Sequence, residues 1–292
     1  MGGLAEPFEF EFFVRGLIAA GLVGVLCAAV GIYVVLRSLA YIGHGLAHSI
    51  FGGAVVSFVS GISFYVGATI WGVFSVLLIN GAARRRQIGG DAAIGIVTTS
   101  AFAVGVALIS RQGRFTQDFD AALFGEILGI TSGDLYVIVG VLALVALILF
   151  FWWKPFLFTT FDPDVAGSYG VPVIWVEVLF SLILAATVIA SLQVLGVTLI
   201  AAALVIPPVT ARLLTDSFTR MFFLAVIVGG LSGFGGVYIS WFIDVSSGAT
   251  VVLLQATIFA FALTYASVRA RWPGGGWGGE GRLAAIENAP ID

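Results

Sequence analysis

The chain has 292 residues, of which 60% are hydrophobic and only 10% are charged, and its formal net charge is −3. Soluble domains carry about 25% charged residues, so this composition excludes an ordinary soluble protein and is typical of a membrane protein. The single cysteine, Cys27, excludes both a disulfide framework and a cysteine metal cluster.

Uniformly apolar runs recur along the chain, and each is close to the roughly 20 residues that a helix needs to cross a hydrocarbon core of about 30 Å. We therefore predict an all-α fold, a polytopic transmembrane helical bundle with eight or nine spans. A further short apolar piece at 123–130 is compatible with a re-entrant segment and leaves the count open. The predicted spans are 13–36, 40–59, 63–82, 91–110, 134–153, 173–191, 194–212, 219–240 and 249–268.

Basic residues indicate which loops face the cytoplasm, because short cytoplasmic loops are enriched in Arg and Lys. The arginine cluster at 84–86 places the loop after the third span inside, and alternation from there puts Lys154, Arg212 and Arg220 on the same side. The chain then divides into three parts: an N-terminal segment (1–12), a transmembrane domain (13–268) and a flexible, Gly-rich cytoplasmic tail (269–292).

Both histidines of the chain fall in one apolar stretch, "AYIGHGLAHSIFGG", at positions His44 and His48. Residues four apart share a face of a helix, so the two imidazoles can point at one spot. Neutral imidazole is a common ligand of transition metals, and titratable groups inside a membrane usually face a pathway. A lone histidine would more simply bond a neighbouring carbonyl, but the pairing predicts a transient metal site shared with other groups.

The stretch "FDPDVAGSYGVPV" at 161–173 lies between two spans and carries signals for a short helix of about two turns. Asp162 can cap its start, Pro163 suits its first turn, and Gly170 can end it. A simple connector needs no such signals, although a hairpin that only joins two spans remains the alternative.

Two further stretches bear on helix geometry. Pro207 and Pro208 lie in the last third of a spanning run and remove two backbone donors, so we expect a helix break or kink there that could line a pathway or reflect packing alone. Gly229 and Gly233 have the small-xxx-small spacing that allows two membrane helices to approach closely.

The chain has no phosphate-binding loop, because its single lysine, Lys154, is followed by Pro155 rather than by Ser or Thr. ATP-driven transport would therefore need a separate ATPase, and we expect this chain not to be an enzyme. Acidic groups within the spans are also few, with Asp91 and Glu177 as the weaker candidates for metal ligands, whereas ion-coupled carriers usually hold more.

Six stretches occur in the order of one known family: "VVLRSLAYIGHGLAHSIFGG", "DAAIGI", "FGEILGITSGDL", "FDPDVAGSYGVPV", "LVIPPVTARLL" and "GVYISWFIDVSSGATVVLL". Together, from about residue 14 to 265, they resemble the membrane permease subunit of ABC importers for zinc, manganese and iron, the ABC-3 group. The family's first motif reads Tyr-x-Gly-Asp-x-Leu-x-His, so this chain has His44 where the family has Asp.

The resemblance implies a multi-pass protein of a bacterial-type plasma (inner) membrane and a homodimer of permeases. It also implies two cytoplasmic ABC ATPase subunits, an extracellular or periplasmic metal-binding protein, and no nucleic acid partner. It makes the helix at 162–170 the coupling helix that meets the ATPase. The residues assigned to this coupling are Asp162, Pro163, Asp164, Val165, Ala166, Gly167 and Gly170.

The resemblance also places His44 and His48 where the family's Asp/His pair meets the metal. Imidazole in place of carboxylate favours zinc, with manganese or iron possible, and we expect no permanently bound cofactor besides the transported ion. Three alternatives stay open: a permease for another cargo such as a metal chelate, a secondary metal carrier that needs no ATPase, and a structural membrane scaffold.

Overall fold

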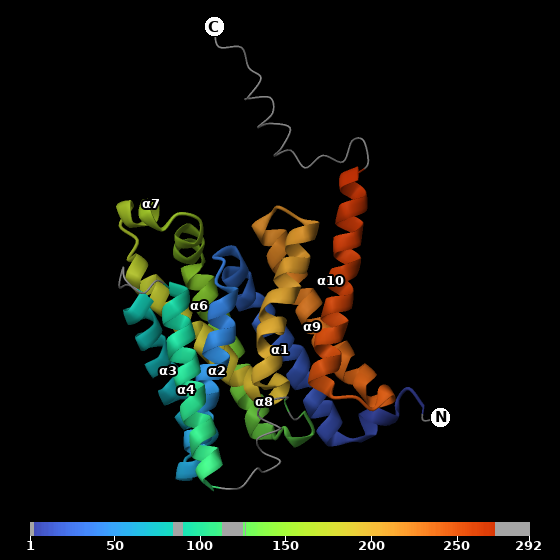
Figure 1. The fold of residues 1–292 in the computed structure, drawn as a ribbon. Coiled ribbons are helices and arrows are strands. Elements are labelled where there is room, and N and C mark those ends of the chain that lie inside the picture. The colour runs from blue at the N-terminus through green and yellow to red at the C-terminus, as the bar shows by residue number, and fades with distance from the viewer. Residues whose placement is uncertain (1–2, 84–89, 113–124, 126, 272–292) are drawn as a thin grey trace.

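The protein is described by a computed structural model that covers residues 3–83, 90–112, 125 and 127–271 (Figure 1). Its described part consists of helices joined by short turns. The helices are η1 (Glu6–Glu9), α1 (Glu11–Leu36), α2 (Ala40–Ser60), α3 (Phe64–Ala83), α4 (Gly90–Gln112), η2 (Ile127–Gly129), α6 (Ser132–Phe161), α7 (Pro163–Ser168), α8 (Val173–Leu214), α9 (Phe218–Ile243) and α10 (Ser247–Arg271).

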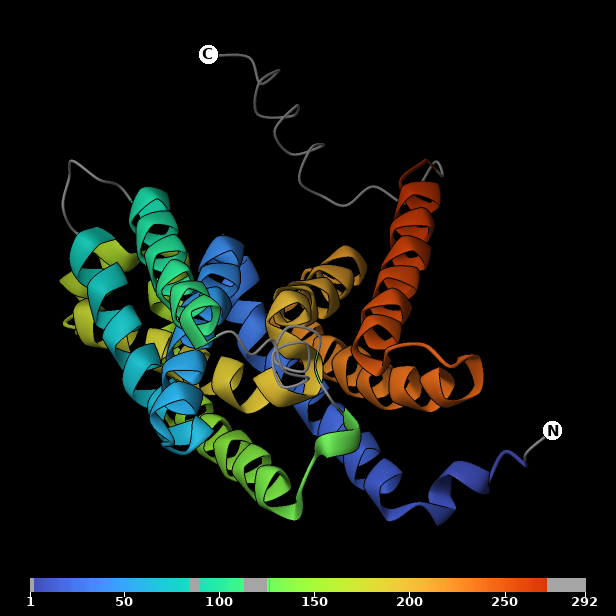
Figure 2. The ribbon, with the colours of Figure 1, turned by 60° about the horizontal axis from the view of Figure 1, so that its bottom comes forward.

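Every predicted span corresponds to a helix, and α8 contains two of them, so the all-α membrane bundle is confirmed. By length and composition, six of the described helices can cross a membrane: α1, α3, α6, α8, α9 and α10. Helices α2 and α4 lie side by side with α3 in the same bundle (Figure 2). Most of the N-terminal segment is also ordered, since the Tyr238 hydroxyl donates to the carbonyl of Leu4 at 2.8 Å. Residues 272–292, most of the predicted tail, lie outside the described residues.

Helix α8 reverses its course at Gly196, which is its non-helical residue, with φ 72° and ψ 160°. A positive φ of this kind is accessible to glycine without steric cost. As the chain proceeds along α8, its contacts with α1 therefore first move towards the N-terminus of α1 and then back towards its C-terminus. These contacts join Phe180 with Tyr33, Ser191 with Cys27, and Leu204 with Gly31. The two halves of α8 are the two spans predicted at 173–191 and 194–212.

The helix does not break at Pro207 and Pro208, because both prolines lie within the helical second half of α8, and a kink there stays a prediction. Proline 208 has no N–H for the carbonyl of Leu204, which would normally accept from it. That carbonyl lies against Gly31 of α1, so closely that a Cβ on Gly31 would collide with it. Packing against α1 thus keeps the helix continuous, as neighbouring helices do for membrane prolines elsewhere.

Helices α1 and α9 pack through small residues, as the Gly229–Gly233 spacing predicts. A Cβ on Gly229 would collide with the carbonyl of Gly24, and one on Gly233 would collide with the carbonyl of Ala20. Close backbone contact of this kind is how membrane helices gain van der Waals packing without a hydrophobic driving force. The core of the bundle is therefore built on α1, which is the most buried of the six candidate spans.

Candidate functional site

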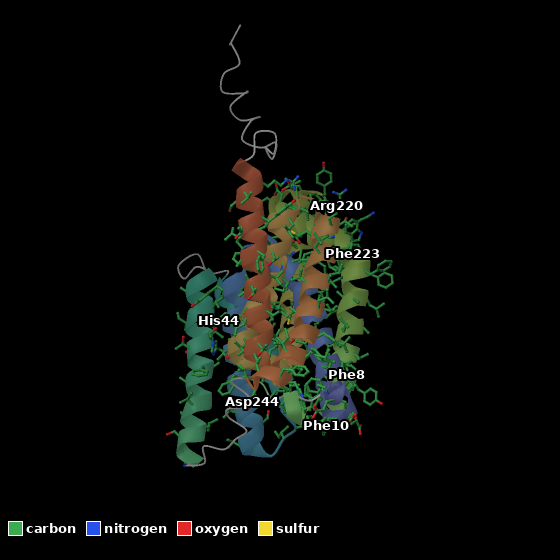
Figure 3. The ribbon with its side chains drawn as sticks, turned by 90° about the vertical axis from the view of Figure 1, so that its right-hand side faces the viewer. Phe8, Phe10, His44, Arg220, Phe223 and Asp244 are labelled. Atoms are coloured by element: carbon green, nitrogen blue, oxygen red, sulfur yellow. The ribbon has the colours of Figure 1, made fainter. Side chains whose placement is uncertain are left out.

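The two histidines lie on one face of α2, as their spacing predicts. Their ring centroids are 4.6 Å apart and their planes are 70° from parallel. The His48 ring is half-buried and packs edge-on against Phe102 of α4 at 5.4 Å, whereas His44 is exposed. Figure 3 shows His44 on the side of the bundle opposite Arg220 and Phe223. The convergence of the imidazoles is confirmed, and their binding of an ion stays a prediction.

Next to Gly45, the residue that follows His44, α4 presents a hydroxyl that no sequence pattern indicated. The Thr98 Oγ1 is buried and has no hydrogen-bond partner among the described residues. It faces Gly45, where an added Cβ would lie 2.7 Å from it. Other membrane threonines, such as Thr187 and Thr210, donate to the carbonyl four residues earlier. The sequence of an apolar helix does not indicate which threonine will lack this bond to its own helix, so only the packing of α4 on α2 reveals Thr98.

Of the two weaker predicted ligands, the structure describes only the side chain of Glu177, and it does not place Glu177 at the pair. Glu177 is exposed near the start of α8, and its charge acts on Arg37. Asp91 belongs to the first turn of α4, and its side chain lies outside the described part. Among the described residues, no group of three or more His, Cys, Asp and Glu side chains is placed to hold a metal ion.

The loop helix predicted after α6 is α7, and its ends are built as its residues predict. The Asp162 carboxylate accepts a hydrogen bond from the backbone N–H of Val165 at 2.9 Å, and Pro163 occupies the first turn. An N-cap of this kind typically stabilises a helix by about 1 kcal/mol. Asp164 follows in the same turn, as suits the positive end of the helix dipole.

The end of α7 is a Schellman motif, in which two bonds close the last turn. The N–H of Val171 donates to the carbonyl of Ala166, and the N–H of Gly170 donates to that of Gly167, both at 3.0 Å. Gly170 has φ 81°, which permits this turn. Ala166 is fully buried, whereas Tyr169 is 78% exposed. The helix is thus fixed on one side and presents its other side at the end of the bundle (Figure 1).

Arg37, directly after α1, ties the end of α6 to the turn that leads into α2. Its guanidinium donates to Thr159 Oγ1 at 2.8 Å and to Thr160 Oγ1 at 2.9 Å, and lies 4.6 Å from the centre of the Phe180 ring. Burial lowers the pKa of this guanidinium, and the carboxylate of Glu177 opposes that shift. Arg37 thus links the segment that precedes α7 to the helix that carries the histidines.

Comparison with known proteins identifies the chain's relatives. Residues 9–266 match the model of the family described as the ABC 3 transport family. The chain belongs to the ABC 3 transport family. With its apolar spanning helices, this membership makes it a multi-pass protein of the bacterial inner membrane and a membrane component of a transport system.

Individual relatives of this ABC 3 family chain align over most of their length. The manganese transport system membrane protein MntC of Halalkalibacterium halodurans is 37% identical over 89% of each chain. A probable iron transport system membrane protein of Haemophilus influenzae is 32% identical over 92% of this chain and 98% of its own. The manganese import system permease protein ScaB of Streptococcus parasanguinis is 33% identical over 86% and 89%.

Solved structures of similar fold extend the comparison to three dimensions. The structure of PsaBC from Streptococcus pneumoniae in complex with Fab matches this ABC 3 family chain with a TM-score of 0.82 at 29% identity, covering 98% of this chain and 100% of that chain. An inward-facing conformation of a putative metal-chelate type ABC transporter matches with a TM-score of 0.67 at 14% identity over 86% and 85%, which shows the fold alone.

Proposed function

We propose that this chain is the permease subunit of an ATP-driven importer of a divalent first-row transition metal. Support comes from its family and from relatives whose names state manganese, iron or permease function. The observation that carries the proposal is the histidine pair, whose rings lie 4.6 Å apart on a membrane helix that is otherwise apolar. The ion is a transported substrate that passes this pair by alternating access, and this chain hydrolyses no nucleotide.

The pathway site combines imidazoles with an oxygen donor. His44 and His48 offer two ring nitrogens, and the unpaired Thr98 Oγ1 lies on the adjacent helix beside Gly45. Two imidazoles and a hydroxyl are too few for a tightly closed site, which suits an ion in transit. Because His44 is exposed in the single chain, a second copy of the chain completes the pathway, in a homodimer.

Manganese or iron is our first substrate, because the named relatives move these metals. Zinc is the second, since imidazole suits it better than it suits manganese, for which carboxylate and water are preferred. Proline 207 and Proline 208 lie in the half of α8 that packs on the α1–α2 region, where Gly43 also contacts Leu204. Gly31 lets this half of α8 approach α1 closely, and in our proposal this half forms a wall of the pathway.

Two cytoplasmic ATPase subunits drive the transport through α7, and an extracellular binding protein delivers the ion. The exposed side of α7, with Val165 and Tyr169, is the surface that the ATPase contacts. Asp162 and Gly170 keep that surface in place through the cap and the Schellman motif. Arg37 follows α1 and precedes α2, and it bonds Thr159 and Thr160 at the end of α6, directly before α7. A displacement of α7 by the ATPase is therefore transmitted through Arg37 to α2, which carries the histidine pair.

The decisive experiment measures uptake of radioactive manganese, iron and zinc by cells that express this permease with its ATPase. We expect His44→Ala and His48→Ala to abolish uptake of the cognate metal while the protein still reaches the membrane. Tyr41→Phe, one turn earlier on the same exposed face, is the matched control and leaves uptake unchanged. His44→Asp keeps transport and shifts the preference towards manganese, since it introduces a hard carboxylate.

Other outcomes of the same experiment distinguish the alternatives. Full uptake of a metal chelate by both alanine variants would make the histidines packing groups and favour a chelate permease. Metal uptake that continues after Val165→Asp and Tyr169→Asp in α7, and without the ATPase, would favour a secondary carrier.

A further inference from the structure

A groove of about 650 Å³ lies between α1, α6 and α9, on the side of the bundle away from the histidine pair. In Figure 3, Phe223 of its wall lies on the opposite side of the bundle from His44. Helix α1 forms the floor with residues four apart, Val25, Ala29 and Tyr33. Helix α6 is among the least buried of the candidate spans, so this groove lies beside an exposed face of the bundle.

The groove has a polar end and an apolar end. Its hydroxyl and indole groups come from three residues that lie towards one end of the bundle. Tyr33 is three residues before the end of α1, Trp153 is in the last third of α6, and Thr219 is the second residue of α9. Its other walls are aliphatic or phenyl side chains, reaching to Leu142 and Val226. Tyrosine and tryptophan are enriched where the lipid head groups begin, so the polar end marks the membrane interface.

Cationic residues stand at this polar end. Lys154 directly follows Trp153, and Arg220 directly follows Thr219, and both are exposed. Lys154 is the single lysine of the chain. Arg220 lies above Phe223 in Figure 3, towards the end at which α10 finishes and which the basic loops predict to be cytoplasmic. Neither residue lines the groove itself, but both lie at the level of its polar end, where their long side chains can reach a phosphate group of the inner leaflet.

The length of the groove matches one leaflet. Along α6 it runs from Leu142 to Trp153, a rise of about 16 Å at 1.5 Å per residue. Half of a hydrocarbon core of about 30 Å is nearly the same depth. A polar, cationic mouth above an apolar channel of this length fits a phospholipid better than a protein segment, which would bring backbone polar groups into the apolar part.

We propose that this groove binds one anionic phospholipid of the cytoplasmic leaflet. An acyl chain lies along α1 between α6 and α9, and Lys154 and Arg220 bind the phosphate. The lipid fills the space beside the Tyr33–Phe218 contact, where the ring centroids are 5.8 Å apart. Basic sites between membrane helices on the cytoplasmic side are known to hold anionic head groups in this manner.

The test is native mass spectrometry of the full chain after release from nanodiscs of phosphatidylcholine that contain a minor fraction of phosphatidylglycerol. We expect one phosphatidylglycerol per chain to be retained in preference to phosphatidylcholine. Lys154→Gln and Arg220→Gln should each lower this preference about fivefold, because a basic residue near the surface contributes about 1 kcal/mol. Arg212→Gln, an exposed arginine at the same end that follows no groove residue, should leave it unchanged.

A second pair of variants tests the apolar part. Ala146→Trp fills the groove and should remove the retained lipid, whereas Ala143→Trp, exposed on α6 outside the groove, should not. Equal retention of both lipids by the wild type, or retention that survives Ala146→Trp in a folded chain, would overturn the proposal. So would a change from dimer to monomer on Ala146→Trp without lipid loss, which would assign the groove to a second copy. The charge variants are exposed, so they test the mouth even if a tryptophan variant does not fold.

Discussion

Replacing Arg37 with glutamine is expected to destabilise the junction of α1, α6 and α8. In the native protein, the guanidinium donates to Thr159 and Thr160 near the end of α6 and lies over the ring of Phe180 in α8. A third, longer bond of 3.3 Å reaches the carbonyl of Phe156. Glutamine is shorter and uncharged, so it can replace at most one of these contacts.

The magnitude follows from the contacts that are lost. The two short bonds from a charged donor contribute about 1.5 kcal/mol each, and the cation–π contact about 1 kcal/mol. Both threonine hydroxyls also donate to carbonyls of α6, so neither is left unpaired by the change. We therefore expect the free energy of unfolding to fall by about 2–4 kcal/mol rather than by the larger amount that an orphaned buried group would cost.

The assay is reversible unfolding in mixed micelles, followed by tryptophan fluorescence. Arg212→Gln, an exposed arginine at the same end of the bundle, is the control and should change the free energy of unfolding by less than about 0.5 kcal/mol. Thr160→Val alone should cost about 1 kcal/mol, and the double variant with Arg37→Gln should lose less than the sum. A cost below about 1 kcal/mol for Arg37→Gln, or strict additivity with Thr160→Val, would refute the Arg37 clamp, that is, the set of bonds from Arg37 to Thr159 and Thr160 together with its contact with Phe180.

Further predictions concern helix packing and the loop helix. Gly229→Val should lower the free energy of unfolding by more than about 2 kcal/mol, because its Cβ would meet the Gly24 carbonyl. As the control, Gly140→Ala adds a Cβ that meets nothing within 4 Å, so it should be neutral or slightly stabilising. The same micelle assay measures both variants. Gly170→Ala forces a side chain to φ 81° and should speed hydrogen exchange of the amides at 170 and 171 by about fivefold to thirtyfold, whereas Gly167→Ala, in the helix proper, should not. Asp162→Ala should speed exchange at the Val165 amide by about fivefold, and unchanged exchange there would contradict the N-cap.

The parts of this molecule that the sequence predicts are those governed by local rules. Each span is long and apolar, so its helix is required by the membrane whatever its neighbours are. The caps of α7 depend on residues within eight positions of one another, and Asp162 and Gly170 both act as their chemistry predicts. The meeting of His44 and His48 likewise follows from the helical repeat alone.

What the sequence could not predict are the contacts between distant segments. The clamp joins Arg37 to residues more than 110 positions later, and the orphaned hydroxyl of Thr98 depends on how α4 lies against Gly45. No local pattern distinguishes this arginine from one that ends in water, or this threonine from the many that bond their own helix.

The break in α8 illustrates how tertiary contacts override a local signal. By local rules, two consecutive prolines should interrupt a helix and a lone glycine in an apolar run should merely weaken it. The helix instead continues through Pro207 and Pro208, because Gly31 lets α1 pack against the carbonyl that proline leaves free. The chain turns at Gly196, where a Cβ on Gly125 would collide with the carbonyl of Val194, so Gly125 packs directly on the turn. In this bundle, a glycine packed against the backbone of another segment is therefore a better marker of a turn or a close helix crossing than a proline is. Replacing Gly196 should accordingly disrupt the fold more than replacing either Pro207 or Pro208.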